Sequence, residues 1–381
     1  MPASPRKSAK SAPGAFNLTK ATEVGRNVVK FGGIVLIILM VGRLLVNGIT
    51  AFWIATHPEP PPPPTQGYGP LPEISFGNEG ATVRPKLYQL ELPGAFPTFS
   101  DRAGVYFLPK DQIGLLSLEA TKAHAARLGF QSEPAELDDD DYRWNRSGII
   151  NATLEMNTVT KNFVYATDYL SRPEVQAVAE LPNTFDAVQT VKQFLSSTDL
   201  LPADMATVAG ETQFLKIAGG ALKPAVSLSD AQVIRVDLFR TPLEGFPTYS
   251  ADGKTGMISA TVASLNGQPT VIALTRSYAP IDYSTVHTYP LRTAQEAWQL
   301  LKAGQGYIAQ ARREDSAIIR SVSLGYFESM DQMFMQPIFV FTGDDDFIGY
   351  VSALDSSAQT AQPAPPQPTP TPSQRPGVIG L

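Results

Sequence analysis

Cysteine is absent from this 381-residue chain, and histidine occurs only at His57, His124 and His287. Without cysteine the chain can form neither disulfide bonds nor thiolate zinc sites. The histidines lie far apart in the sequence, and none belongs to the H-E-x-x-H pattern of zinc hydrolases. These absences argue against a disulfide-stabilised fold and against metal-dependent hydrolysis, so the stability of the fold must come from packing.

The sequence offers little other sign of catalysis. Ser4-Pro5-Arg6-Lys7 formally matches the S-x-x-K pattern of serine nucleophiles, but it lies in the basic head, where no pocket is expected. The sequence contains no Ser/His/Asp arrangement, no phosphate-binding loop and no dinucleotide-binding fingerprint. Its 36 acidic residues outnumber its 30 basic residues, whereas nucleic-acid binding needs a basic surface. We therefore predict a protein that is not an enzyme, has no catalytic, cofactor-binding or metal-binding residues, and does not bind nucleic acid.

Only one long apolar run is present, Phe31 to Ala55. As a helix with a rise of about 1.5 Å per residue it would reach roughly 37 Å, enough to cross a hydrocarbon core of about 30 Å. Arg43, near its middle, costs about 2.5 to 3.5 kcal/mol of insertion free energy, but the Leu, Ile, Val and Phe residues return about 4 to 8 kcal/mol. We predict a transmembrane helix over residues 31–55. A cleaved signal peptide is the alternative, although the run is about twice the usual length and no A-x-A site follows it.

The flanking charges predict how this helix is oriented. Residues 1–30 contain six Lys or Arg residues and one acid, Glu23, whereas residues 57–381 contain 23 basic and 35 acidic residues. Because positive flanks stay in the cytoplasm, the N-terminus should be cytoplasmic and the body extracytoplasmic. The prediction is a single-pass protein of the cell membrane with type II topology, in contact with the lipid bilayer.

Arg43 and Asn47 are one helical turn apart, so both lie on one face of the predicted span. Charged side chains inside a membrane usually face another protein or a wet cavity. We predict that Arg43 and Asn47 bind a polar group on the transmembrane helix of a partner. The alternative is that Arg43 extends toward the cytoplasmic headgroups and that the span is only an anchor.

Proline-rich composition marks the linkers. Pro58 and Pro60 to Pro64 predict an extended polyproline II stalk after the span, and a second proline-rich stretch follows Ala361. The expected organisation is a disordered basic head (1–30), the transmembrane helix (31–55), the stalk (56–85), a first α+β domain (86–178), a second α+β domain of two half-repeats (179–356) and a disordered tail (357–381).

Three helices are predicted in the body, beginning near residues 117, 184 and 293. Each is followed by a strand and then by a strand hairpin; the hairpin through Asn266-Gly267 has the strongest turn signal. A loop-rich insertion is expected up to about Ser229. The shared order of elements indicates repeated units in which one helix covers an antiparallel sheet, an α+β fold.

Capping and periodicity set the expected helix faces. In the first helix Ser117 is the candidate N-cap, Gly129 the C-cap, and the shared face carries Ala120, Ala123 and Arg127 beside Leu128. The apolar face of the second helix is Phe185, Val188, Val191, Phe194 and Leu195. In the third, Thr293 and Glu296 form a capping box, and the buried stripe is Ala294, Ala297, Trp298 and Leu301.

Two groups of residues could bind a ligand. The acidic runs Asp138–Asp141 and Asp344–Asp346 offer oxygen ligands for calcium, but neither has EF-hand spacing, and solvated turns are the favoured interpretation. Several aromatic residues could line a groove for a peptide or glycan, although alternating positions favour the core. They are Trp144, Trp298, Tyr326, Phe327, Phe334, Phe339 and Phe341.

Residues of the third unit resemble those of YycH/YycI-type accessory proteins. The resemblance rests on Tyr289-Pro290, Ala297-Trp298, Leu301, Gly304, Val322, Leu324-Gly325-Tyr326-Phe327, Gln336-Pro337, Val340-Phe341 and Tyr350-Val351. The first unit looks like a PepSY module, over Ser117 to Phe130 and Thr153 to Ala166. The two resemblances together cover roughly residues 86–170 and 180–355.

The resemblance implies a single-span extracytoplasmic protein that binds other proteins and regulates a sensor histidine kinase or another complex of the bacterial cell envelope. It implies no catalytic residues. Two alternatives remain: a PepSY-like inhibitor or chaperone of an exported hydrolase, and an envelope-glycan-binding structural protein. The expected partner is a membrane or envelope protein, and the sequence identifies neither that partner nor the oligomeric state.

Overall fold

A computed structural model describes residues 18–56, 62–77, 80, 81, 83–110, 112, 114–173 and 181–360. Two compact units divide the chain, residues 1–63 and residues 64–381. We call the second unit the body and describe each unit by itself. Residues 1–17 of the predicted head and residues 361–381 of the predicted tail lie outside the described residues.

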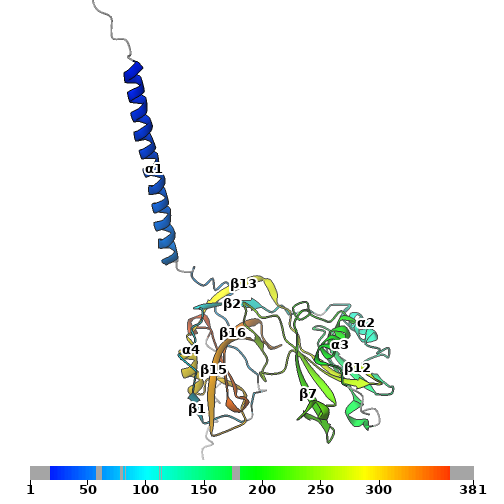
Figure 1. Cartoon of the computed structure of the whole chain (residues 1–381). Coiled ribbons are helices and arrows are strands. Elements are labelled where there is room, and N and C mark those ends of the chain that lie inside the picture. Colours follow the sequence, from blue (N-terminus) through cyan, green and yellow to red (C-terminus); the bar gives the residue numbers. More distant parts are fainter. Residues whose placement is uncertain are drawn as a thin grey trace, which may run out of the picture. The chain divides into compact units, whose positions relative to one another are not determined.

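The first unit contains one long helix, α1 (Leu18–Thr56) (Figure 1). Within it, Val29–Thr50 is long and apolar enough to cross a membrane, and its side chains are exposed, so it is not the core helix of a globular domain. A membrane anchor and a signal sequence both fit these properties. The helix begins earlier than predicted, because no proline lies between Pro13 and Pro58 to interrupt it.

The body is an α+β unit with two large sheets. The first is a nine-stranded sheet in which every neighbouring pair is antiparallel, in the order β3-β4-β5-β6-β12-β11-β9-β7-β8. Its strands are β3 (Ala135–Asp138), β4 (Asp141–Arg146), β5 (Ala152–Asn157), β6 (Phe163–Thr167), β7 (Glu211–Ala218), β8 (Ala221–Pro224), β9 (Val233–Leu238), β11 (Ile258–Leu265) and β12 (Gln268–Arg276).

The eight-stranded sheet has a central path β1-β15-β16-β17-β14, to which β2, β10 and β13 are added. Strands β1 and β10 pair with β15 in parallel, and the other pairs are antiparallel. The strands are β1 (Leu87–Leu90), β2 (Arg102–Phe107), β10 (Thr248–Tyr249), β13 (Asp282–Pro290), β14 (Tyr307–Gln310), β15 (Ser316–Phe327), β16 (Phe334–Gly343) and β17 (Ile348–Ser352).

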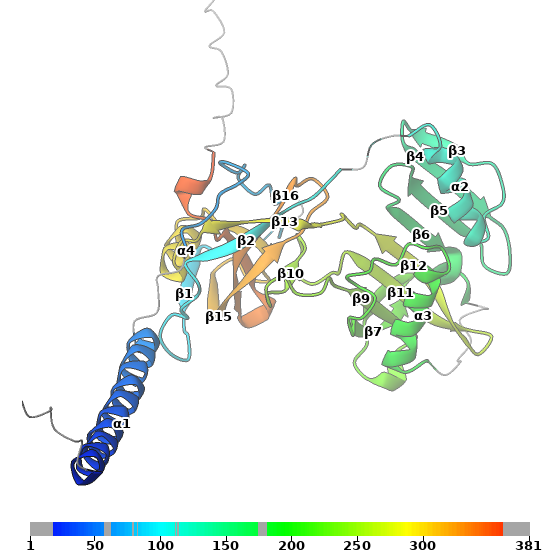
Figure 2. The same ribbon diagram turned by 90° about the horizontal axis from the view of Figure 1, so that it is seen from above.

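The sheets group the strands differently from the expected domains 86–178 and 179–356. Strands β1 and β2, from the start of the body, belong to the eight-stranded sheet with β13 to β17. Strand β10 lies between β9 and β11 in the chain, yet it pairs with β15 of the other sheet. Figure 2 shows these two groups of strands in the body. The chain therefore crosses between the sheets several times, which sequence patterns do not reveal.

Three helices pack on the sheets: α2 (Ser117–Arg127), α3 (Thr184–Ser196) and α4 (Ala294–Lys302). Helix α2 contacts β5, and α3 contacts β9, β11 and β12 of the same sheet, whereas α4 contacts β17. Short 3₁₀ turns complete the described elements: η1 (Asp168–Ser171), η3 (Leu228–Asp230), η4 (Asp344–Asp346) and η5 (Ser356–Ala358).

Helix α4 matches its prediction closely. Thr293 and Glu296 form the capping box, with the Glu296 amide donating to Thr293 Oγ1 at 3.2 Å and the Thr293 amide donating to Glu296 Oε2 at 2.7 Å. The predicted stripe is buried, and Trp298 packs at a tilt on Phe341 of β16 with ring centroids 6.2 Å apart. The core under α4 is therefore the one that the sequence indicated.

The predicted face of α2 is wrong. Thr121, Ala125 and Leu128 are buried, whereas Ala120 and Ala123 are exposed. Burial of Thr121 is tolerated because its hydroxyl donates to the carbonyl of Ser117, at 2.8 Å.

The caps of α2 were predicted only in part. Its N-cap is Leu116, without a side-chain hydrogen bond, and Ser117 Oγ instead accepts from the Gly114 amide. Gly129 has the expected positive φ, 85°.

Two further expectations differ from the structure. Phe185, predicted on the apolar face of α3, lies in the first turn of the helix and is exposed. The expected loop-rich insertion contains the hairpin β7–β8, whose turn is Gly219-Gly220 with positive φ at both residues. Such a turn needs glycine, and it was the available signal for this hairpin.

The second half of the predicted stalk packs on the body. We call residues 64–77 the strap. The Gln66 amide donates to the Thr288 carbonyl at 3.0 Å, and Leu71 is fully buried. The Leu71 amide donates to the Ala358 carbonyl, and the Thr360 amide donates back to Leu71. Apolar and aromatic residues follow Pro64, and burying them is favourable, so this segment does not form a free polyproline spacer.

Candidate functional site

The predicted partner-binding residues Arg43 and Asn47 lie on α1, in the apolar stretch, with both side chains exposed. They are four residues apart and therefore share one face. Thr50 continues this face, but its hydroxyl is satisfied within the helix by the carbonyls of Val46 and Asn47, at 2.9 and 3.0 Å. The described chain supplies no hydrogen bond to the Arg43 or Asn47 side chain.

The second acidic run forms the turn η4 between β16 and β17, where basic side chains pair with each carboxylate. Arg320 bonds Asp344 at 2.7 Å, Arg313 bonds Asp345 at 3.3 Å, and both Arg312 and Lys254 bond Asp346. Hydrogen bonds from Arg320 lower the pKa of Asp344, and those from Lys254 lower the pKa of Asp346. Their charges are therefore already compensated.

The first run, Asp138–Asp141, occupies the tight turn between β3 and β4. Among the described residues, no group of three or more acidic, histidine or cysteine side chains could hold a metal ion. Both runs thus have the geometry of turns, the interpretation that their spacing favoured.

The aromatic residues considered for a groove lie in the cores of the sheets. Six of them, Trp144, Trp298, Tyr326, Phe327, Phe339 and Phe341, are buried, and Phe334 is half-buried. Trp144 belongs to the core under α2 and α3, and Trp298, Phe339 and Phe341 belong to the core under α4. They do not line a common groove.

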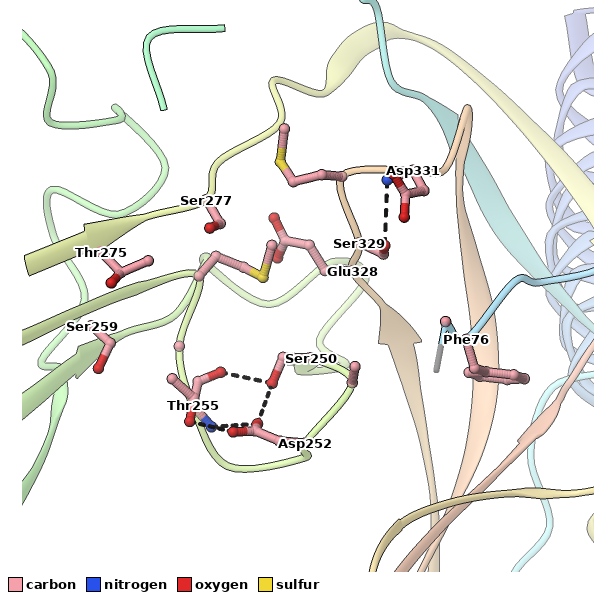
Figure 3. Close-up of a pocket in the computed structure, with 15 residues that line it drawn as sticks. Phe76, Ser250, Asp252, Thr255, Ser259, Thr275, Ser277, Glu328, Ser329 and Asp331 are labelled. Carbon is pink, nitrogen blue, oxygen red and sulfur yellow. Dashed lines mark hydrogen bonds between the residues drawn. The ribbon is translucent and has the colours of Figure 1, made fainter. Parts of the chain in front are cut away.

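A cleft of about 640 Å³ lies between the two sheets of the body (Figure 3). One wall is formed by residues at neighbouring ends of β11 and β12, and the opposite wall by residues 328–331, which follow β15. The loop between β10 and β11 and the end of the strap, with Phe76, complete the lining. This volume is within the range of about 300 to 1,000 Å³ that is typical of ligand sites.

A buried ion network lies beside this cleft, and one of its members, Glu328, also lines the cleft. Arg240, just after β9, is fully buried and pairs with both Asp204 and Glu328. Asp204 belongs to the segment between α3 and β7, whereas Glu328 follows β15 in the other sheet. The Arg240 guanidinium also lies over the ring of Tyr278, at 4.6 Å from the centroid. One guanidinium thus connects carboxylates from the two sheets, and we call Arg240, Asp204 and Glu328 the inter-sheet clamp.

Additional hydrogen bonds satisfy part of the clamp. Arg240 Nη2 donates to the Ala279 carbonyl at 2.7 Å, and the hydroxyls of Tyr278 and Tyr283 donate to Asp204 at 3.2 and 2.8 Å. Two clamp atoms have no hydrogen bond of normal geometry within the described part of the chain. They are Arg240 Nε and Glu328 Oε2, whereas Glu328 Oε1 pairs with Arg240.

Burial raises the pKa of Glu328, against the attraction of Arg240. For Arg240 itself, burial opposes the charge, but Glu328 and Asp204 outweigh burial and raise the pKa of the guanidinium. The clamp therefore keeps a buried positive charge by placing two carboxylates around it. A buried charge held in this way is strongly destabilising when a partner is removed.

Sequence reasoning missed both the cleft and the clamp. Asp204, Arg240 and Glu328 are far apart in the chain and match no motif, and they meet only because the two sheets pack together. The single available signal was the position of Arg240, two residues after the end of the apolar strand β9. No protein-family model, curated protein or solved structure matches the chain.

Proposed function

We propose that this chain is a single-span membrane protein whose acidic body lies outside the cytoplasm, binds other proteins and regulates a membrane complex such as a sensor histidine kinase. The observation that carries the proposal is the apolar stretch Val29–Thr50, of which no part is buried, while the body forms its own compact unit. An exposed apolar helix of this length is stable in a bilayer and unfavourable in water.

The orientation rests on charge. The basic residues before the span keep the N-terminus in the cytoplasm, so the body is exported with its excess of acidic residues. The alternative of a cleaved signal sequence would release the same body in soluble form. An uncleaved anchor fits the length of the apolar stretch better, since a signal-peptide core has about 7 to 15 apolar residues.

The order of elements in the body supports the regulatory role. Helix, strand and strand hairpin recur as α2, β4 and β5–β6, then as α3, β9 and β11–β12, and again as α4, β15 and β16–β17. We infer three repeated units of the kind seen in PepSY modules and YycI-type regulators, with β3, β7, β8, β10 and β14 as additions. Proteins of this type regulate by binding, and that likeness motivates a kinase or another envelope complex as the partner.

The span contributes to recognition through the face that carries Arg43 and Asn47. Their side chains have no partner in the described chain, and an arginine near the bilayer centre is unfavourable by about 2.5 to 3.5 kcal/mol or more unless its charge is satisfied. A carboxylate or polar group on a neighbouring transmembrane helix would satisfy it. The span then selects a partner as well as anchoring the body.

Site-specific photo-crosslinking in intact cells tests this function. A photoreactive amino acid replaces Asn47, and in a matched control it replaces Leu45, about 200° around the same helix at 100° per residue. We expect a discrete crosslinked membrane protein from position 47 and none from position 45, and the product should disappear in the Arg43→Leu background. Equal products from both positions, or no loss in Arg43→Leu, would show that the span is only an anchor.

A further inference from the structure

The cleft between the sheets is strongly biased in charge. Its charged lining residues are Asp252, Glu328 and Asp331, and no Lys, Arg or His belongs to the described lining. Asp252 stays ionised, because hydrogen bonds from Thr255 and from backbone amides outweigh its burial and lower its pKa. The cleft is therefore acidic, and it favours a positively charged occupant.

Glu328 provides a second, independent observation. Its side chain is 1% exposed, and Oε1 is engaged by Arg240. Oε2, on a residue that lines the cleft, has no hydrogen-bond donor of normal geometry in the described chain, although the Thr248 hydroxyl lowers the pKa of the carboxyl. Leaving a buried carboxylate oxygen without a donor is unfavourable, because the oxygen has lost its hydrogen bonds to water. A donor on a ligand would remove that penalty.

Hydroxyl groups line the wall opposite Glu328. Ser259 and Thr275 are directly paired across β11 and β12, and Ser277 lies two residues beyond Thr275, so the three side chains point to the same face of the sheet. Figure 3 shows these side chains together with Glu328 in the cleft. None of the three hydroxyls donates a hydrogen bond to another described residue. They can accept from N–H groups of an occupant.

Part of the remaining lining is apolar and adaptable. Met257 and Met330 line the cleft, together with Phe76 from the strap. Methionine side chains adjust to irregular shapes, so they can accommodate an aliphatic stem. An apolar stem ending in several N–H donors and a positive charge matches all three properties: acidic charge, free acceptors and a methionine-lined surface.

From this complementarity we propose that the cleft binds an organic cation, an ammonium or guanidinium group on an aliphatic stem. Its source is either a free amine or the Lys or Arg side chain of a partner polypeptide. The cation donates to Glu328 Oε2 and to the hydroxyls of β11 and β12, while Asp252 and Asp331 provide long-range attraction. This inference deepens the proposed protein-binding function, and it depends on that function only for the polypeptide source.

Isothermal titration calorimetry on the full-length chain in nonionic detergent measures binding of three probes. Agmatine represents a free cation, acetyl-Ala-Arg-Ala-amide a polypeptide, and the same peptide with citrulline a neutral isostere of arginine. We expect the arginine peptide to bind at least about tenfold more tightly than the citrulline peptide, a difference of about 1.4 kcal/mol. Agmatine affinity equal to that of the arginine peptide would indicate a free amine, and tighter peptide binding a polypeptide.

Three variants locate the binding in the cleft. Glu328→Gln should weaken arginine-peptide binding at least about tenfold, and Asp331→Asn about two- to fivefold, the range of an exposed ion pair. Thr275→Tyr, at an exposed strand position that tolerates tyrosine, should block the cleft without unfolding the sheet. The matched controls are Asp139→Asn, an exposed acid outside the cleft, and Thr270→Tyr at the other end of β12; both should bind normally.

The proposal is overturned by equal affinity for the arginine and citrulline peptides, or by no binding of either cation at millimolar concentration. Unchanged binding in Asp331→Asn and Thr275→Tyr would equally contradict it, since both variants leave the clamp intact even if Glu328→Gln does not fold. These probes require neither a membrane nor a partner protein. A negative result would therefore overturn the cleft proposal alone, and the photo-crosslinking experiment would still test the proposed function separately.

Discussion

The two sheets of the body are assembled in different ways. All strands of the nine-stranded sheet come from one continuous segment, residues 135–276, and most of its neighbours are joined by hairpins. The eight-stranded sheet collects strands from residues 87–107, 248–249 and 282–352, and it includes two parallel pairs. The first sheet depends on local connections, and the second depends on contacts between distant parts of the chain.

This difference indicates which single substitutions should lower the stability of the body most. Local hairpins lose little entropy on closure, whereas distant segments must be held by specific contacts. Those contacts are the inter-sheet clamp, the core under α4 and the strap with its hydrogen bonds to Ala358 and Thr288. Each of these contacts can be removed by a single substitution.

The largest effect is expected from Arg240→Ala. It leaves the carboxylates of Asp204 and Glu328 buried without their cation, so we expect a loss of about 5 kcal/mol in the free energy of unfolding. Urea unfolding of the full-length chain followed by tryptophan fluorescence measures it. The control Arg127→Ala removes an exposed pair with Asp199 and should change stability by less than about 1 kcal/mol. Similar values for the two variants would contradict the structural role of the clamp.

Trp298→Ala tests the core that joins α4 to the eight-stranded sheet. Trp298 is 7% exposed and packs on Phe341, so its truncation should lower the free energy of unfolding by about 3 to 5 kcal/mol. Phe185→Ala, at an exposed position on α3, is the control and should change stability by less than about 0.5 kcal/mol. A loss below about 1 kcal/mol for Trp298→Ala would show that this side chain is not part of the core.

Leu71→Ala tests whether the strap packs on the body or serves as a free stalk. Leu71 is fully buried against Val105, Tyr289 and Leu354, so we expect a loss of about 2 to 3 kcal/mol. Hydrogen exchange of the Leu71 and Thr360 amides should also increase, since each takes part in the pairing of these segments. Wild-type stability and exchange in the variant would mean that residues 64–77 serve only as a spacer.

The smallest effect concerns the capping box of α4. Thr293→Ala should lower stability by about 1 kcal/mol at neutral pH. Hydrogen bonds from Thr293 lower the pKa of Glu296, so ionised Glu296 contributes stability above its unfolded pKa, and this contribution is lost as the pH falls through the lowered folded value. The difference in unfolding temperature between wild type and Glu296→Gln should therefore shrink in acid. If the difference in unfolding temperature between wild type and Glu296→Gln grew below pH 4.5, it would contradict a stabilising role of ionised Glu296.

Local signals in the sequence predicted the elements that depend on neighbours in the chain. The capping box at Thr293, the Asn266-Gly267 hairpin and the stripe through Trp298 are all present, because each is fixed within one or two turns of backbone. The face of α2 was mispredicted since a buried threonine breaks the apolar pattern. The parallel pairing of β1 with β15 has no local signature at all.

The candidate sites also differ in whether local sequence signals could predict them. Arg43 and Asn47 could be singled out because an ionisable residue in an apolar run is conspicuous in sequence alone. The cleft and the clamp could not, because Asp204, Arg240 and Glu328 meet through packing of two sheets, and each looks like an ordinary charged residue in its own segment. Sites formed between non-local elements require the fold.

The central claim, an uncleaved anchor with an exported body, is tested most directly by single-cysteine labelling, for which a chain without cysteine is well suited. Ser8→Cys marks the head and Ser227→Cys an exposed position of the body. In cells stripped of their wall, a membrane-impermeant maleimide should label Ser227→Cys directly and Ser8→Cys only after permeabilisation, both at full chain length. Labelling of Ser8→Cys from outside, protection of Ser227→Cys, or a mature chain that has lost residue 8 would contradict the account.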